Sequence, residues 1–387
     1  MVGTLVGMEL SFIRSLYDVP GPWASVYLDT THDTESARGA IKIRWKDLRA
    51  SLRHDIDDRT LHALDAEVID DRTLRVLEGA EFEQRRHPGR HGLAMFAAQG
   101  EMRYAEVMDE PFRSDLAEVS PLPHLTPLVI QRGEQIPWIR VAVNRVGADI
   151  ESPTNDTIQV QGTHLYPIRK THGGGWSQEH LQRKAELRWQ QNAKEVAEQV
   201  NRFADSVGAE LVIVAGDVRA RRLLIDQLPE RWRERVVEVE AGSRAPGADP
   251  IGVERATMQA VANVVAQRRT AVLDRFLARG GEYGVAGVAA VVAAFDRSQV
   301  GTLMLDPDGV AKTQLWVGLD LPHIALSEDD LLQLGARRIE YVRAEDALIR
   351  AAAMTDAELM VVSPTELNLD EGIGAVLRYV DPATYRT

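Results

Sequence analysis

Residues 171–190 read THGGGWSQEHLQRKAELRWQ, and this stretch decides which fold the sequence can adopt. The three consecutive glycines, Gly173–Gly175, have no side chains, so the backbone there can turn tightly or approach another surface closely. After them, apolar residues recur at spacings of three and four, which predicts a long amphipathic helix that ends near Gly208. The apolar stripe comprises Leu181, Ala185, Trp189, Ala193, Val196, Val200, Phe203 and Val207.

The start of this helix is basic, although the formal net charge of the chain is −13. Salt screening confines the influence of distant acidic residues to roughly 8–10 Å, so the local excess of arginine and lysine decides what binds there. A bare glycine tip on a cationic helix suits insertion among RNA phosphates. The predicted tip loop comprises His172, Gly173, Gly174, Gly175, Trp176, Ser177 and Gln178, and the predicted RNA-binding residues are Arg169, Lys170, Arg183, Lys184 and Arg188.

Trp176 has two interpretations. Its ring can stack on an unpaired base, a contact worth about 1–3 kcal/mol, or it can pack back onto its own domain. A large apolar ring beside three glycines gains little from exposure to solvent. This argument favours a contact with RNA.

Strands and helices alternate along the whole chain. Around the basic helix, strand patterns at 140–144, 210–216 and 236–239 flank a helical pattern at 217–228, an order that predicts an α/β fold with partly parallel pairing. Residues 241–250, rich in glycine and proline, read as a linker before another long helix. We therefore expect three α/β domains, at residues 1–134, 135–265 and 266–387.

Composition excludes several classes of protein. The chain has no cysteine, which excludes a disulfide framework, a thiol nucleophile and a thiolate metal site. Met1–Leu10 has no basic region and reaches Glu9 too early for a signal peptide, and the longest apolar stretch, residues 284–295, is too short to span a bilayer. We therefore expect a cytoplasmic protein with no membrane partner. The acidic net charge also argues against nonspecific attraction to nucleic acid.

Familiar catalytic and ligand-binding patterns fail on inspection. Residues 175–179 lack the final glycine of a nucleophile elbow, so Ser177 is a poor nucleophile candidate. Residues 309–313 lack the Gly-Lys pair of a phosphate loop. Residues 372–377 hold two of the three glycines of a dinucleotide motif, and we interpret them as a turn with tight helix packing. We expect no catalytic residue, no metal site and no cofactor.

A second basic run, at residues 84–91, precedes a predicted strand at 92–98. Pro88 and Gly89 separate its two histidines, which argues against helical metal-ligand geometry. The run is either a solvated connection or a phosphate-contacting loop, because the forked donors of arginine suit phosphate oxygens. The candidate contact residues are Arg85, Arg86, His87, Arg90 and His91.

At the glycine motif the sequence resembles the archaeal and eukaryotic class I peptide-release factors, Pelota and the bacterial homologues of that superfamily. The release-factor pattern is a Gly-Gly-Gln tip, then serine, then a long arginine-rich helix, and residues 172–188 resemble it with Trp176 at the place of the glutamine. Residues 281–287 and 300–305 are similar to the family's entry into its C-terminal domain. Residues 371–379, EGIGAVLRY, resemble its closing Gly-Ile-Gly-x-x-Leu-Arg-Tyr signature. The resemblance covers roughly residues 138–387 and is strongest to the ribosome hibernation factors of the actinobacterial Balon type.

This resemblance implies three α/β domains in a tRNA-shaped arrangement within the ribosomal A site, in contact with the rRNA of both subunits. The first domain would face the decoding centre, with the basic run at 84–91 as its candidate contact. The glycine tip would approach the peptidyl-transferase centre. The third domain would meet a translational GTPase, elongation factor Tu or another.

The resemblance leaves more than one function open. The family's glutamine positions the attacking water, whereas the indole of Trp176 has one donor and no acceptor. We therefore expect a noncatalytic hibernation factor that occupies the A site of idle ribosomes during stress. The alternative is a peptidyl-tRNA hydrolase or ribosome rescue factor that uses Gln178, and a third option is a Pelota-like factor that recruits a splitting GTPase. The first segment shows no Asn-Ile-Lys-Ser element, so codon-directed termination is not expected.

Overall fold

The computed structural model describes residues 7–33, 37–62, 71–84, 89–108, 110–133, 136–153, 157–161, 175–240, 250–278 and 282–380, with the backbone alone at 54–62, 71, 80–84, 175–185 and 250. The chain divides into two compact units, one formed by residues 1–134 with 269–387 and the other by residues 135–268. Both units combine helices with sheets, so the predicted α/β class is confirmed. The domain boundaries predicted at residues 134 and 265 stay predictions. The three-domain, tRNA-shaped arrangement stays a prediction.

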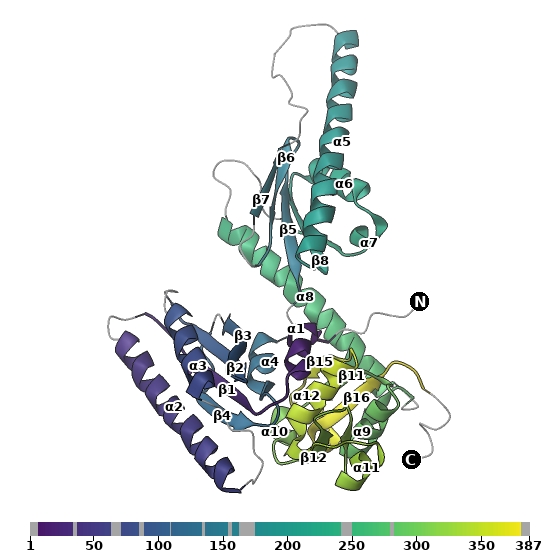
Figure 1. Ribbon diagram of the computed structural model, residues 1–387. Coiled ribbons are helices and arrows are strands. Elements are labelled where there is room, and N and C mark those ends of the chain that lie inside the picture. Colours follow the sequence, from purple (N-terminus) through teal and green to yellow (C-terminus); the bar gives the residue numbers. More distant parts are fainter. Residues whose placement is uncertain are drawn as a thin grey trace. The chain divides into compact units, whose positions relative to one another are not determined.

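The unit at residues 135–268 is built on a five-stranded mixed sheet of order β7-β6-β5-β8-β9 (Figure 1). Strands β5, β8 and β9 are parallel, and β5, β6 and β7 are antiparallel. Parallel pairing of β5 with β8 requires a long crossover, which the predicted basic helix provides. The strands are β5 (Trp138–Val143), β6 (Gly147–Glu151), β7 (Thr157–Gln161), β8 (Leu211–Gly216) and β9 (Val236–Glu238).

Helices cover both faces of this sheet. One face packs against the apolar stripe of α5, including Val196, Val200 and Phe203, as the sequence predicts. The opposite face packs against the first half of α8 through Ala260 and its neighbours. The helices of this unit are α5 (Gly175–Ser206), α6 (Val218–Gln227), α7 (Glu230–Arg233) and the first part of α8 (Pro250–Leu277).

In the other unit, residues up to 134 form an antiparallel sheet of order β3-β2-β1-β4. One face of this sheet is covered by the helices α2 and α3, through side chains such as Trp45 and Leu77. The elements are α1 (Ser11–Arg14), η1 (Ser15–Asp18), β1 (Trp23–Asp29), α2 (Ala37–His62), α3 (Asp71–Gln84), β2 (Gly92–Ala98), β3 (Glu101–Met108), β4 (Leu116–Ser120) and α4 (Thr126–Arg132).

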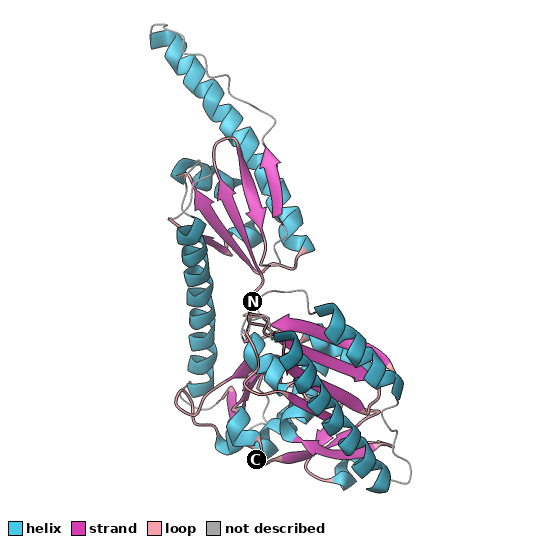
Figure 2. Cartoon of the chain, turned by 90° about the vertical axis from the view of Figure 1, so that its left-hand side faces the viewer, coloured by secondary structure: helices cyan, strands magenta, loops and turns pink. Residues whose placement is uncertain are grey.

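Residues from 269 onward add two sheets to the same unit, of order β10-β16-β11-β15 and β13-β12-β14 (Figure 2). The end of α8 packs on the first of them through Val272 and Phe276. The elements are β10 (Gly284–Ala286), α9 (Val288–Asp296), β11 (Val300–Leu305), α10 (Pro307–Val310), β12 (Gln314–Gly318), β13 (Ile324–Ala325), α11 (Glu328–Gln333), β14 (Ile339–Arg343), α12 (Ala344–Met354), β15 (Glu358–Val361), η2 (Asp370–Gly372) and β16 (Ile373–Leu377).

One hydrophobic core joins the first and third segments of the chain. Tyr27 and Phe96, from the second face of the first sheet, belong to the same buried cluster as Leu348 of α12. The chain near its start also pairs with the third segment, because the amide of Met8 donates to the carbonyl of Leu359 at 2.7 Å. The two segments are therefore held together by shared packing, not by a surface contact.

The prediction for residues 372–377 was wrong. Ile373–Leu377 forms β16, an inner strand between β10 and β11, and not a turn packed on a helix. Gly372 has φ +73°, and a Cβ there would lie 2.7 Å from the backbone of Gly309. A Cβ on Gly374 would lie 2.8 Å from Leu369. These glycines allow neighbouring parts of the chain to approach β16 closely. In the sequence, glycines that serve this purpose cannot be told from glycines of a turn.

Candidate functional site

The basic helix predicted from the sequence is α5, and its first half stands clear of the sheet. Among the described side chains of α5, which start at residue 186, the first buried one is Asn192. None of those at 186–191 is buried, and Leu187 is 59% exposed. We call residues 175–191 the stalk. At a rise of 1.5 Å per residue the stalk is about 25 Å long. Figure 1 shows α5 continuing past the ends of β5 and β6.

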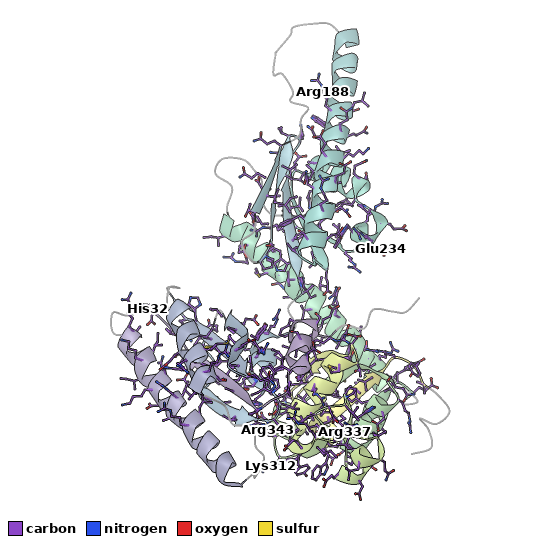
Figure 3. All side chains as sticks on the ribbon, viewed as in Figure 1. His32, Arg188, Glu234, Lys312, Arg337 and Arg343 are labelled. Carbon is purple, nitrogen blue, oxygen red and sulfur yellow. The ribbon has the colours of Figure 1, made fainter. Side chains whose placement is uncertain are left out.

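The predicted tip and RNA-binding residues fall on and beyond the stalk. Gly175, Trp176, Ser177 and Gln178 form the first turn of α5, and Arg183 and Lys184 follow on the same helix. The side chains of these residues lie outside the described part. Arg188 is described and is partly exposed (Figure 3). The remaining predicted residues, Arg169, Lys170, His172, Gly173 and Gly174, lie outside the described residues.

Only part of the second basic run is described. Arg85, Arg86 and His87 lie outside the described residues, and Arg90 and His91 lie just before β2. The Arg90 guanidinium is 3.3 Å from the Glu110 carboxylate, and both side chains are 66% exposed. The carbonyl of His91 accepts from the amide of Thr30 at 2.9 Å. An exposed ion pair contributes at most about 1 kcal/mol, so Arg90 can exchange Glu110 for a phosphate at little cost.

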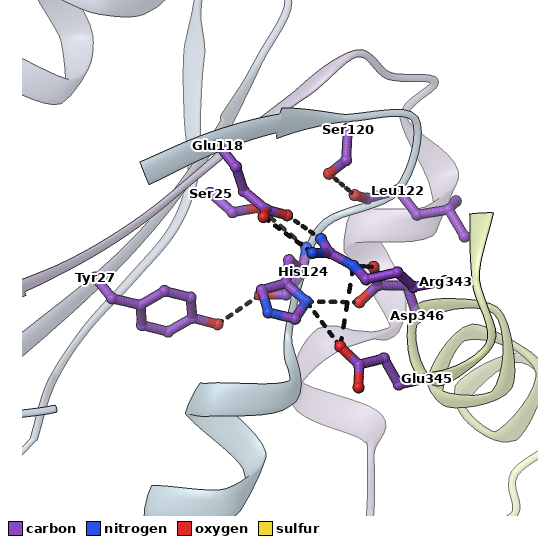
Figure 4. Close-up of polar contacts among 9 residues, drawn as sticks. All are labelled: Ser25, Tyr27, Glu118, Ser120, Leu122, His124, Arg343, Glu345 and Asp346. Carbon is purple, nitrogen blue, oxygen red and sulfur yellow. Dashed lines mark hydrogen bonds and ion pairs between the residues drawn. The ribbon is translucent and has the colours of Figure 1, made fainter. Parts of the chain in front are cut away.

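A buried polar cluster, which the sequence reasoning missed, lies where the first and third segments pack together (Figure 4). His124 is 7% exposed, and its Nδ1 atom is 2.9 Å from Asp346 Oδ1 and 3.5 Å from Glu345 Oε1. Arg343, at the end of β14, places its Nε 3.0 Å from Asp346 Oδ2 and also pairs with Glu118 of β4. We call these five residues the interface cluster.

Backbone contacts fix the histidine of this cluster. The amide of His124 donates to Ser25 Oγ at 3.0 Å, and the His124 carbonyl accepts from the Tyr27 hydroxyl at 2.5 Å. Both partners belong to β1, so the segment that leaves the first sheet is tied back onto it. The imidazole is thereby aimed at the N-terminus of α12, where Glu345 and Asp346 lie.

The cluster carries more carboxylates than guanidinium groups, and this imbalance shifts its pKa values. Burial disfavours the charged imidazole, but the hydrogen bond and the attraction of Asp346 outweigh that cost, so the pKa of His124 is raised. Burial, together with repulsion from Asp346, raises the pKa of Glu345. Burial also opposes the charge of Arg343, yet its hydrogen bond to Glu118 and the field of Asp346 raise its pKa, so it stays charged.

Three side chains of the cluster are of the kind that bind metal ions. Ligand atoms of His124, Glu345 and Asp346 all lie within 4.8 Å of one another. However, the guanidinium of Arg343 already supplies a cation to Asp346, and a proton on His124 supplies a second. We therefore interpret the cluster as a network of ion pairs that stabilises the packing of the first segment on the third.

The raised pKa values predict that the unit of residues 1–134 and 269–387 loses stability as the pH rises. Since the folded state holds the protons of His124 and Glu345 more tightly than the unfolded chain, it binds more protons. The contribution of His124 is complete below its unfolded pKa of about 6.5 and is lost as the pH rises through the folded value. The urea midpoint should therefore fall with pH, and less steeply in His124→Gln. Equal pH dependence in both proteins would contradict this role.

Known proteins resemble this chain both in its middle segment and over its length. A family model described as bacterial archaeo-eukaryotic release factor family 2 matches residues 137–282, which span β5 to the end of α8. Two uncharacterized proteins of Mycobacterium tuberculosis, MT2704 and Rv2629, are each 29% identical over 380 residues, which are 96% of this chain and 97% of theirs.

Three solved structures are similar to this chain over most of its length. The archaeal translation termination factor aRF1 shares 16% identity over 97% of this chain and 99% of its own, with a TM-score of 0.24. Ribosome-bound archaeal Pelota shares 15% identity over 97% of this chain and 96% of its own, with a TM-score of 0.35. Saccharomyces cerevisiae Dom34, a translation termination-like factor, shares 10% over 77% and 82%, with a TM-score of 0.40.

The segment that carries the basic helix α5 is therefore similar to the bacterial archaeo-eukaryotic release factors of family 2. Among the described helices, none is long and apolar enough to cross a membrane.

Proposed function

We propose that this protein is a cytoplasmic hibernation factor that occupies the A site of idle ribosomes and contacts the rRNA of both subunits. The observation that carries the proposal is the stalk. A helix of about 25 Å that starts at a glycine-rich tip and bears Arg183, Lys184 and Arg188 lies within the segment that matches the release-factor family. A narrow helix with few anions can enter a space lined by phosphates, and a bulky acidic domain cannot.

We further propose that the partner GTPase is elongation factor Tu and that it binds the third segment. In support, Leu326, Leu332 and Leu334, on and beside α11, are each a little more than half exposed. Exposed leucines on and beside one short helix are typical of a surface that binds another protein. The acidic first turn of α11, Glu328–Asp330, adds a charge that a basic partner surface would complement.

Ribosomes loaded with peptidyl-tRNA should release no peptide when the protein is added, and the protein should inhibit the puromycin reaction by occupying the A site. Gln178 is the side-chain amide of the predicted tip, and the indole of Trp176 offers no acceptor to orient water. Both the wild type and Gln178→Ala should therefore release no peptide and should inhibit the puromycin reaction equally. Elongation factor Tu should pellet with the ribosomes in larger amount when the protein is present.

Three outcomes would each overturn part of this proposal. Peptide release by the wild type that is lost in Gln178→Ala would identify a peptidyl-tRNA hydrolase instead. Binding that leaves the puromycin reaction unchanged would place the protein outside the A site. If elongation factor Tu does not pellet with the complex, another translational GTPase, such as a splitting factor, becomes the partner to test.

A further inference from the structure

A small cleft lies at the point where the stalk leaves the sheet. Asn144 and Arg145, just after β5, line it together with Trp189 and Asn192 of α5 and Arg219 of α6. Its volume of about 10 Å³ admits one group of the size of a water molecule. The cleft belongs entirely to the unit of residues 135–268, so its geometry is set within one body.

Arg145 is held in a fixed position at this cleft. Its guanidinium carbon lies 4.7 Å from the centre of the Trp189 ring, and its carbonyl accepts from the side-chain amide of the buried Asn192 at 3.3 Å. The Oδ1 atom of Asn144 accepts from the amides of Val146 and Gly147, each at 2.9 Å, and closes the turn to β6. The Arg145 side chain nevertheless remains 44% exposed. A stacked but accessible guanidinium is ordered before any ligand arrives.

Arg219 is placed beside it by the start of α6. Asp217 caps this helix, since its Oδ1 accepts from the amides of Arg219 and Ala220 at 3.0 Å each, and its Oδ2 lies 3.5 Å from Arg145. Arg219 is exposed. Arg188 lies on α5 one helical turn before Asn192, so the base of the stalk carries Arg145, Arg188 and Arg219 in an acidic protein.

The register of α5 connects this surface to the predicted tip. Asn192, Arg188 and Lys184 are each four residues apart and so lie along one side of the helix. Basic residues thus continue from the cleft toward the start of α5. A nucleic-acid backbone presents phosphates at regular intervals, and forked arginine donors bind them in fixed geometry.

We propose that Arg145, Trp189 and Arg219 form a second RNA-contacting surface at the base of the stalk, which binds the phosphodiester backbone of RNA when the tip is inserted. The inference rests on the proposed function, because it requires that the stalk enters an RNA-lined cavity. The second surface would add a contact of fixed position, which limits how deeply the stalk can enter the RNA-lined cavity. The stacked Arg145 is the anchor, and Arg219 is the second phosphate ligand.

The test variant carries both Arg145→Gln and Arg219→Gln. The control variant carries both Arg202→Gln and Arg235→Gln. The control removes the same charge from the same unit, and Arg235 also lies beside an indole, 5.8 Å from the Trp232 ring. Arg235 precedes β9 and is at the opposite end of the parallel strands from Arg145. Binding to purified ribosomes is measured by pelleting over a series of salt concentrations.

We expect the Arg145 and Arg219 variant to bind about tenfold or more weakly at physiological salt, with a logarithmic salt slope lower by about 1–2, because each lost phosphate contact lowers the slope by about 0.7–0.9. The control should bind like the wild type. Arg219→Gln alone, at an exposed position, should fold normally and lower the slope by about 1.

Wild-type affinity and slope in a folded double variant would overturn the inference and leave the proposed function standing. Weaker binding with an unchanged salt slope would mean that the surface contacts a ribosomal protein and not RNA, which also overturns it. If the wild type itself does not bind ribosomes, the proposed function fails first.

Discussion

Replacing Arg183, Lys184 and Arg188 with glutamate is expected to abolish co-sedimentation with ribosomes at moderate salt. Three positive charges become three negative ones on the part of the chain that would lie nearest to RNA phosphates. Phosphate contacts dominate the affinity of such complexes, so we expect a loss of about a thousandfold or more. Pelleting with purified ribosomes over a range of salt concentrations measures it.

Unfolding of the stalk is not expected to cause this loss. Glutamate forms helices about as readily as arginine and lysine. The matched control replaces Arg202, Arg235 and Arg255, which are exposed in the same unit away from the stalk, with glutamate. If the stalk variant is folded and sediments like the wild type, the tip does not enter an RNA-lined site.

Most helices and strands at residues 135–268 could be predicted from the sequence because their signals are local. The apolar stripe of α5 appears in the buried cluster from Val196 to Phe203, and Gly208, with φ +61°, lies just beyond the end of the helix. Strand β6 was missed, since Gly147–Glu151 reads GADIE and has a single β-branched residue. Its strand conformation comes from pairing with β5 and β7, which a local pattern does not contain.

The interface cluster could not be predicted for a different reason. His124 and Asp346 are 222 positions apart, and each has an ordinary local explanation. Glu345 and Asp346 are acidic residues in the first turn of a helix, where they are favoured in any case. A histidine between prolines reads as part of a connection. The cluster exists because the first and third segments share one core, and that packing is a property of the tertiary fold.

The proposed RNA surface at the base of the stalk could be predicted from the sequence only in part. Trp189 was assigned from the sequence to the apolar stripe, and in the structure it is partly exposed under the guanidinium of Arg145. The stripe continues with Ala193, so the sequence does not show that the helix leaves its core at Trp189. Its stacking partner comes from a strand turn 44 residues earlier, and only the sheet order brings the two together.

Asp346→Ala is expected to lower the free energy of unfolding of the unit of residues 1–134 and 269–387 by about 3–5 kcal/mol, because breaking a buried charge pair leaves its partners without compensation. Asp346 is 2% exposed and contacts both His124 and Arg343. The matched control is Asp356→Asn, which also removes an ion pair between the first and third segments, with Arg14, and keeps a residue type that tolerates the φ of 52° at this position. The Asp356 side chain is 75% exposed, so its loss should cost less than about 1 kcal/mol.

Hydrogen exchange of the β1 and α12 amides reports on this unit separately from the other. Exchange that is accelerated equally in the two variants would show that the interface cluster does not hold the segments together, and acceleration in Asp346→Ala alone would show that it does.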